Sequence, residues 1–151
     1  AQHEHRGTSL IVLGFGGNDA DDRMSAEQWE RDYREVLHMV RAARPNTACL
    51  LMAPLDQAER DERGNIETMS SVPVIVEAQR RAALAEGCAF FDTFSAMGGD
   101  GAMRRWFRTN PRLAFGDFRH ATPAGYRVVG TMLYKALLKG FADYLAAHGE
   151  R

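Results

Sequence analysis

Two short polar segments, far apart along the chain, carry residue types that can catalyse acyl transfer. The first is Gly16-Gly17-Asn18-Asp19, which follows an apolar segment expected to be a strand. A glycine-rich turn lets a substrate approach the backbone, and a side-chain amide such as that of Asn18 can donate to a developing oxyanion. Asn and Asp after two glycines are also favourable turn chemistry. Taken alone, the segment is more readily interpreted as a plain turn.

The second segment is Asp117-Phe118-Arg119-His120, directly ahead of a predicted helix. A spacing of three residues lets the Asp117 carboxylate fold back and hold one imidazole nitrogen of His120. The other nitrogen is then free to act as a general base. A lone Asp-x-x-His is more often a turn-capping Asp beside a surface His. The chemistry is therefore indicated by the two segments together and not by either one.

Together the two segments resemble the SGNH/GDSL hydrolase family. The stretch LIVLGFGGNDA over 10–20 is similar to the third block of that family, with its G-x-N-D core. The stretch DFRHATPAGYRVVG over 117–130 is similar to its fifth block, D-x-x-H followed by T-x-x-G-Y and a helix. The resemblance covers nearly the whole chain. It implies a carboxylic ester hydrolase, an acyl- or acetylesterase, that acts through a Ser-His-Asp triad and an oxyanion hole containing Asn.

The resemblance also implies a role for each matching residue. His120 would be the general base, Asp117 would orient it, and Asn18 would donate to the oxyanion. Gly16 and Gly17 would form the substrate loop. The resemblance implies no cofactor and no metal, although Asp19, Asp21 and Asp22 gather in one loop. An acidic loop that is solvated ahead of a helix is the more common meaning of such a cluster.

The nucleophilic Ser of that family lies in a G-D-S-type block before the G-x-N-D block, and nothing ahead of Gly14 here can supply it. Ser95 is the least implausible internal substitute because it follows a predicted strand, yet its context lacks the strained turn that exposes a nucleophile. The sequence starts at Ala1 with a polar stretch, which is typical of a cut chain. We expect residues 1–151 to be the C-terminal portion of one SGNH-hydrolase-like domain, incomplete and inactive alone. Its N-terminal half would be missing or present as a separate chain.

Two other functions stay open from the sequence. The first is a non-catalytic α/β binding or assembly module derived from a hydrolase. The second is a thioesterase or lysophospholipase with the same machinery. The motif MGG-DGAM-x-x-W over 97–106 also resembles members of the family that act on acetylated cell-wall or other polysaccharides. The expected partner is therefore a small-molecule or carbohydrate ester.

The elements that position these residues alternate as strand, helix, strand, helix, strand and helix. This order predicts a partial doubly wound parallel sheet, three strands with flanking helices. The family resemblance implies that this sheet is half of an SGNH-hydrolase or flavodoxin-like α/β fold. The first strand is apolar throughout and is expected to be buried on both faces, which argues against an exposed edge. The expected strands are 8–13, 48–53 and 88–91, the expected helices are 25–44, 72–86, 102–108 and 122–147, and 56–65 is expected to be an exposed charged loop.

Composition excludes several other classes of function. The 19 basic and 20 acidic residues give a formal net charge of −1, so nucleic acid is a poor partner. Apolar runs are far shorter than the ~20 residues that cross a bilayer. No signal peptide is visible, which leaves the compartment open, with a periplasmic or secreted parent as one reading.

Several further side chains have two readings each. Cys49 and Cys88 are expected to be buried free thiols, with a disulfide as the less favoured alternative. Three apolar residues could wall an acyl pocket, although core packing is their commoner fate: Met97, Trp106 and Phe107. Four arginines form a local basic stretch that is expected to be solvated, with anionic or sugar substrates as a minor alternative: Arg104, Arg105, Arg108 and Arg112.

Overall fold

The computed structural model describes residues 7–22 and 24–149. The elements are, in order, β1 (Leu10–Gly14), the 3₁₀ turn η1 (Asn18–Asp21), α1 (Ala26–Ala43), β2 (Ala48–Met52), β3 (Ala58–Arg60), β4 (Ile66–Thr68), α2 (Ser71–Ala85), β5 (Ala89–Phe91), α3 (Thr93–Ala96), α4 (Ala102–Phe107) and α5 (Pro123–His148). No described helix is long and apolar enough to cross a membrane.

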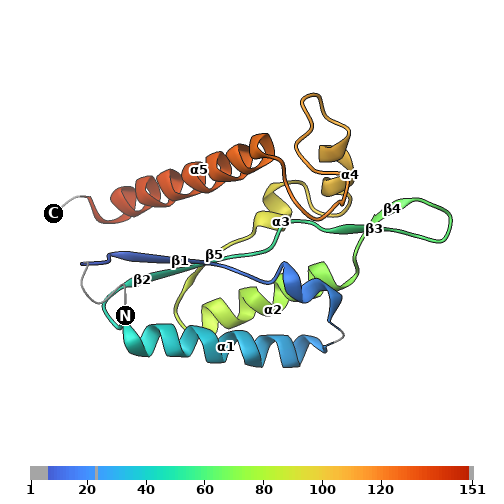
Figure 1. Ribbon diagram of the computed structural model, residues 1–151. Coiled ribbons are helices and arrows are strands. Elements are labelled where there is room, and N and C mark those ends of the chain that lie inside the picture. Colours follow the sequence, from blue (N-terminus) through green and yellow to red (C-terminus); the bar gives the residue numbers. More distant parts are fainter. Residues whose placement is uncertain (1–6, 23, 150–151) are drawn as a thin grey trace.

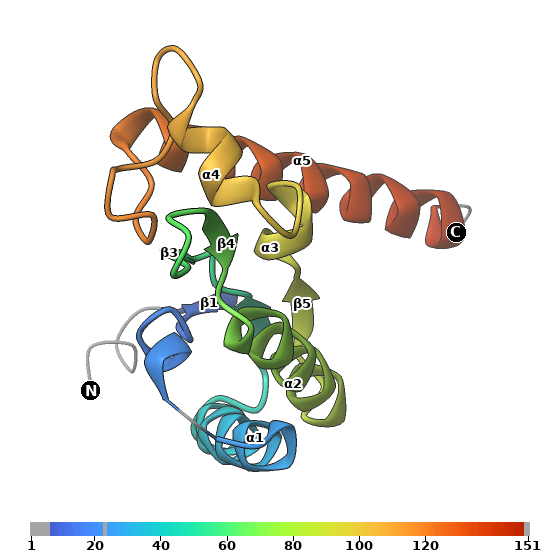
Figure 2. The same ribbon diagram turned by 90° about the vertical axis from the view of Figure 1, so that its right-hand side faces the viewer.

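The main sheet is parallel, with the strand order β1-β2-β5. Helices α1 and α2 cover one face, and α5 runs along the other (Figure 1). The carboxyl ends of the three strands share one edge, where η1, α3 and α4 gather (Figures 1 and 2). Ligands bind at this edge in open α/β sheets. The predicted fold class, a three-stranded parallel sheet with flanking helices, is confirmed.

The first helix shows why the α1–α2 face is well packed. A capping box starts α1, because the Ser25 hydroxyl accepts from the Gln28 N–H while the Gln28 side chain accepts from the Ser25 N–H. Its apolar residues recur every four positions, so Trp29, Tyr33 and Leu37 all face the sheet and are buried. Leu37 is fully buried against the same core that holds residues of α2.

The opposite face of the sheet is much less covered, which corrects the expectation for the first strand. That strand was predicted to be buried on both faces, but Leu10 is 41% exposed and Val12 is 45% exposed. Two causes act together: β1 is an edge of the described sheet, and α5 buries only Gly125 and Val129. A stripe of large apolar side chains along α5 is exposed: Tyr126, Tyr134, Leu137, Leu138, Phe141, Tyr144 and Leu145.

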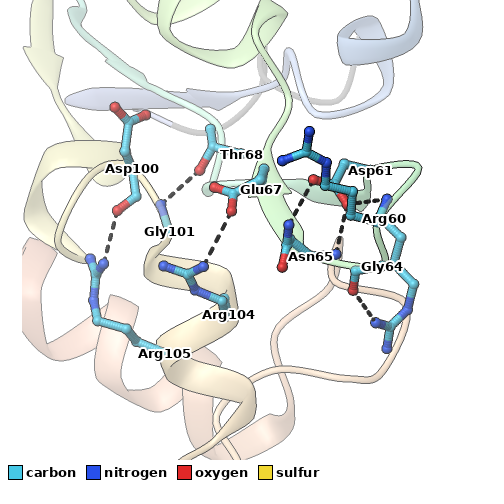
Figure 3. Close-up of polar contacts among 11 residues, drawn as sticks. Arg60, Asp61, Gly64, Asn65, Glu67, Thr68, Asp100, Gly101, Arg104 and Arg105 are labelled. Carbon is cyan, nitrogen blue, oxygen red and sulfur yellow. Dashed lines mark hydrogen bonds and ion pairs between the residues drawn. The ribbon is translucent and has the colours of Figure 1, made fainter.

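The expectation of an exposed loop over 56–65 is partly wrong as well. The segment contains β3, which pairs with β4 in an antiparallel hairpin, and Asp56 at the start of the segment is fully buried. The Asp56 carboxylate accepts from the Thr68 hydroxyl (2.8 Å) and from the Met103 N–H (2.7 Å). Burial raises the pKa of Asp56, whereas these two hydrogen bonds act in the opposite direction. Thr68 also accepts from the Gly101 N–H at 2.7 Å, so the hairpin is fastened to α4 (Figure 3).

Cys49 and Cys88 form a disulfide, so the expectation of two free thiols is wrong. Leu50 pairs with Ala89 in the parallel register of β2 and β5, which places the two preceding residues, both cysteines, side by side. Their Cα atoms are 4.7 Å apart, within the span that a disulfide bridges. In a sequence, two cysteines in apolar segments look the same whether they are bonded or free. The register between the strands decides whether they pair, and the sequence does not show that register.

Candidate active site

An open pocket of about 370 Å³ lies over the carboxyl ends of the three main strands. It is formed where the loop after β1 meets the loop before α5. Its lining includes Gly17, Asn18 and His120. Apolar walls come from the ends of the strands and from α5: Phe15, Met52, Ala53, Pro54, Leu55, Tyr126 and Val129. Two segments that the sequence separates widely therefore face one space.

His120 and Asp117 form a close pair at this pocket. The Nδ1 atom of His120 lies 2.8 Å from Oδ2 of Asp117, and the other carboxylate oxygen accepts from the backbone N–H groups of Arg119 (3.0 Å) and His120 (3.1 Å). Partial desolvation is the largest single influence on the Asp117 pKa and raises it. The three hydrogen bonds outweigh it together, and the pKa is lowered. The carboxylate therefore stays ionised, and a Nδ1–H tautomer leaves Nε2 of His120 unprotonated for general-base work.

The loop that carries Asn18 is held by two side chains from other parts of the chain. Gln57 donates to the Gly17 carbonyl at 2.6 Å, and the Ser71 hydroxyl of α2 donates to the Ala20 carbonyl at 2.6 Å. These two bonds clamp the backbone on either side of Asn18. The Asn18 side chain is exposed within this frame and lines the pocket. A donor held on a fixed backbone is what oxyanion stabilisation requires.

Tyr33 of α1 holds the same loop through Asp19. Its hydroxyl donates to Oδ2 of Asp19 at 2.7 Å, and the tyrosine is buried against Trp29 and Phe15. Burial, followed by the Asp19 carboxylate, raises the pKa of Tyr33 well above its usual range. The phenol therefore remains a hydrogen-bond donor at any working pH.

Gly16 permits the sharp turn into this loop. Its φ is +101°, which L side chains rarely adopt, and a Cβ built there would lie 2.5 Å from Nε2 of Gln79. That amide is fully buried and donates to the Phe15 carbonyl at 3.0 Å. Gly16 is itself buried and does not line the pocket, unlike Gly17. Of the predicted loop pair, only Gly17 faces the pocket.

The His120 loop is fixed by its neighbour Phe118. This residue has a positive φ of 57°, its side chain is buried, and its ring packs edge-on against Phe107 with ring centroids 5.0 Å apart. Its carbonyl accepts from the Ala58 N–H at 2.9 Å. The loop then passes into α5, whose cap is Thr122 accepting from the Gly125 N–H.

The structure thus places the predicted site residues in one region. Asn18, Gly17 and His120 line the pocket, and Asp117 reaches it through its contact with His120. Sequence reasoning missed Gln57, which is buried, lines the pocket and holds Gly17. In the sequence, Gln57 is only one polar residue within a charged stretch, and nothing marks it as part of the site. Tyr126 also lines the pocket. It is the tyrosine of the T-x-x-G-Y motif, but the sequence did not predict that it lines the pocket.

Other candidates lie away from the pocket. The Ser95 hydroxyl donates to Asp92 at 2.8 Å, in the cap of α3. Met97, Trp106 and Phe107 belong to a hydrophobic cluster and do not line the pocket, so core packing is their role. None of the four arginines of the basic stretch lines this pocket: Arg104, Arg105, Arg108 and Arg112. All five serines lie in the described residues, and none of them lines it either.

Comparison with known proteins agrees with this architecture. A structure described as peptidoglycan O-acetylesterase in action is 25% identical, with a TM-score of 0.74, and the match covers 87% of this chain and 37% of that one. A structure from Parabacteroides merdae, described as that of a GDSL-like lipase, is 18% identical, with a TM-score of 0.59, and the match covers 85% of this chain and 59% of that one. The chain therefore spans less than two thirds of either structure. No curated protein matches the sequence.

A three-stranded parallel sheet flanked by helices, superposable on these esterase and lipase structures, defines the SGNH hydrolase fold. The family model described as GDSL-like Lipase/Acylhydrolase matches residues 1–128, and the chain belongs to that family. The resemblance found in the sequence is confirmed.

Proposed function

We propose that this chain supplies the general base, the orienting carboxylate and the oxyanion donor of a carboxylic ester hydrolase. His120, Asp117 and Asn18 hold these roles, and the nucleophilic serine comes from outside the 151 residues. The observation that carries the proposal is the shared pocket, because Asn18 and His120 line one space while Nδ1 of His120 lies 2.8 Å from Asp117.

The proposed reaction follows from these positions. Nε2 of His120 takes the proton of the serine hydroxyl as its oxygen attacks the ester carbonyl, and Asp117 holds the imidazolium that forms. The Asn18 amide donates to the oxyanion of the tetrahedral intermediate. Collapse releases the alcohol, which receives the proton from His120 and leaves an acyl-serine. Water then attacks the acyl group with His120 again as base, and this step releases the acid and the serine.

The serine would arrive with an N-terminal portion that completes the same domain, of which residues 1–151 are the C-terminal part. Two observations support this. The edge strand β1 and the stripe on α5 expose apolar surface that an additional layer would cover, including Leu10 and Val12. Two buried polar atoms at the pocket wall, Oε1 of Gln57 and Oγ1 of Thr93, have no partner in the described chain.

The proposed substrate is an acetyl ester of a polysaccharide. The solved relative at 25% identity is described as a peptidoglycan O-acetylesterase. The MGG-DGAM-x-x-W motif points to the same class of substrate. The Cys49–Cys88 disulfide supports an oxidising, extracytoplasmic compartment, where such polymers occur.

The test is hydrolysis of p-nitrophenyl acetate and of an O-acetylated polysaccharide by the full-length gene product. We expect His120→Ala to remove most of the turnover and Asn18→Ala to lower kcat by about 10²–10³-fold. A folded Asn18→Ala protein that loses less than about threefold would reject the oxyanion role. A full-length protein that is folded yet inert toward both esters would favour a non-catalytic binding or assembly module.

A further inference from the structure

A forked ion pair joins the two loops that carry the proposed site. Nη1 of Arg119 lies 2.7 Å from Oδ2 of Asp21, and Nη2 of Arg119 lies 2.9 Å from Oδ1 of the same carboxylate. Asp21 ends the 3₁₀ turn that begins at Asn18, and Arg119 directly precedes His120. The pair is therefore a direct side-chain link between the loop of the oxyanion donor and the loop of the base.

Both partners are charged over the working pH range. The hydrogen bonds from Arg119 are the main cause that lowers the pKa of Asp21, and those to Asp21 are the main cause that raises the pKa of Arg119. An exposed ion pair usually adds little to stability. The fork matters more for geometry, because two parallel hydrogen bonds fix the orientation of the partners as well as their separation. Arg119 also lines the pocket, so this orientation is set at the site itself.

Each end of the link is anchored independently. On one side, Tyr33 holds Asp19 in the same 3₁₀ turn. On the other side, Asp117 holds the His120 ring and accepts from the Arg119 N–H. A movement of Asp21 relative to Arg119 would therefore shift whole loops and not single side chains.

A second connection shows how closely the two loops are tied. The adjacent residues Gln57 and Ala58 bond one loop each: the Gln57 side chain donates to the Gly17 carbonyl, and the Ala58 N–H donates to the Phe118 carbonyl. This bridge holds the two loops together at Gly17 and Phe118. The Asp21–Arg119 fork fixes them at a second point, and two points are needed to remove a hinge motion about the first.

We infer that Asp21 and Arg119 are positioning residues for the ester hydrolysis, which they serve by setting the distance between the Asn18 amide and the His120 imidazole. The inference rests on the proposed function. The transition state needs both groups at once, whereas the apolar walls that hold the ground state come from other residues of the pocket. Opening the fork therefore lowers kcat and leaves KM nearly unchanged.

The test uses the full-length gene product with p-nitrophenyl acetate. Asp21→Asn and Arg119→Gln each remove one side of the fork, and we expect each to lower kcat roughly tenfold with KM within twofold, since small misplacements of catalytic groups cost up to about 10²-fold. The double variant should be no worse than either single variant, because both remove the same interaction. Arg119→Lys keeps the charge but has no fork, and it should lower kcat by about threefold.

A matched control ion pair lies far from the pocket. Nε of Arg81 in α2 and Oε2 of Glu30 in α1 are 3.0 Å apart, and neither residue lines the pocket, so Glu30→Gln should leave kcat unchanged. Additive losses in the double variant, or a kcat for Asp21→Asn within twofold of the parent, would overturn the inference while Asn18→Ala and His120→Ala remain impaired. If those two site variants keep full turnover instead, the proposed function fails and the positioning role fails with it.

Discussion

Replacement of Gly16 by Ala is the sharpest probe of the frame that holds the proposed oxyanion donor. Gly16 has a φ of +101°, and an added Cβ would lie 2.5 Å from Nε2 of Gln79. Holding an L residue at that φ costs about 1–3 kcal/mol. Pushing Gln79 aside breaks its bond to the Phe15 carbonyl and leaves buried polar groups unpaired, which costs about 1–3 kcal/mol more. The sum is roughly 2–6 kcal/mol.

Thermal unfolding of the full-length gene product measures this effect. A protein of 150–250 residues loses about 2–4 °C of Tm per kcal/mol, so we expect Gly16→Ala to lower Tm by roughly 4–24 °C. Gly140→Ala is the matched control, because Gly140 is an exposed position of α5 outside the arc of the apolar stripe, with no atom near its missing Cβ. That change should be neutral or stabilise by up to about 1 kcal/mol. Equal Tm values for Gly16→Ala and the parent would refute the reasoning.

Three further predictions concern other contacts. Converting both Cys49 and Cys88 to Ala opens a bridge of sequence separation 39, and chain entropy predicts a loss of up to about 4 kcal/mol, seen as a lower Tm under non-reducing conditions but not in excess dithiothreitol. Tyr33→Phe removes a 2.7 Å bond to the Asp19 carboxylate and should cost about 1.5–3 kcal/mol in denaturant unfolding; an unchanged midpoint would contradict this. The pKa of Asp61 is lowered, chiefly by the Asn65 side chain. Its stabilising effect is therefore complete above the ordinary Asp pKa and is lost as pH falls through the lower folded-state value. Asp61→Asn should thus flatten the fall of Tm as the pH drops below the ordinary Asp pKa.

The sequence predicted the main elements of the fold because their signals are local. The Ser25–Gln28 capping box, the four-residue spacing of apolar side chains in α1 and the Thr122-Pro123 start of α5 each act within a few residues. The β3–β4 hairpin escaped prediction because its three-residue strands lie in a charged stretch. The disulfide escaped because it depends on the register between β2 and β5, which no local pattern encodes.

The candidate site divides in the same way. Asn18, Asp117 and His120 were found because each lies in a short motif of recognisable spacing, and the structure brings Asn18 and the Asp117–His120 pair to the same pocket region. The residues that hold these motifs in place had no such signal. Gln57, Tyr33 and Arg119 act through single long-range contacts, which only the folded chain reveals.

Labelling the full-length gene product with a fluorophosphonate ester tests the central claim most directly, since this reagent reacts with an activated serine. Peptide mass mapping should place the adduct on one serine outside the 151 residues, and His120→Ala should abolish labelling. An adduct on Ser95 or any other serine of this chain, or full labelling without His120, would contradict the account.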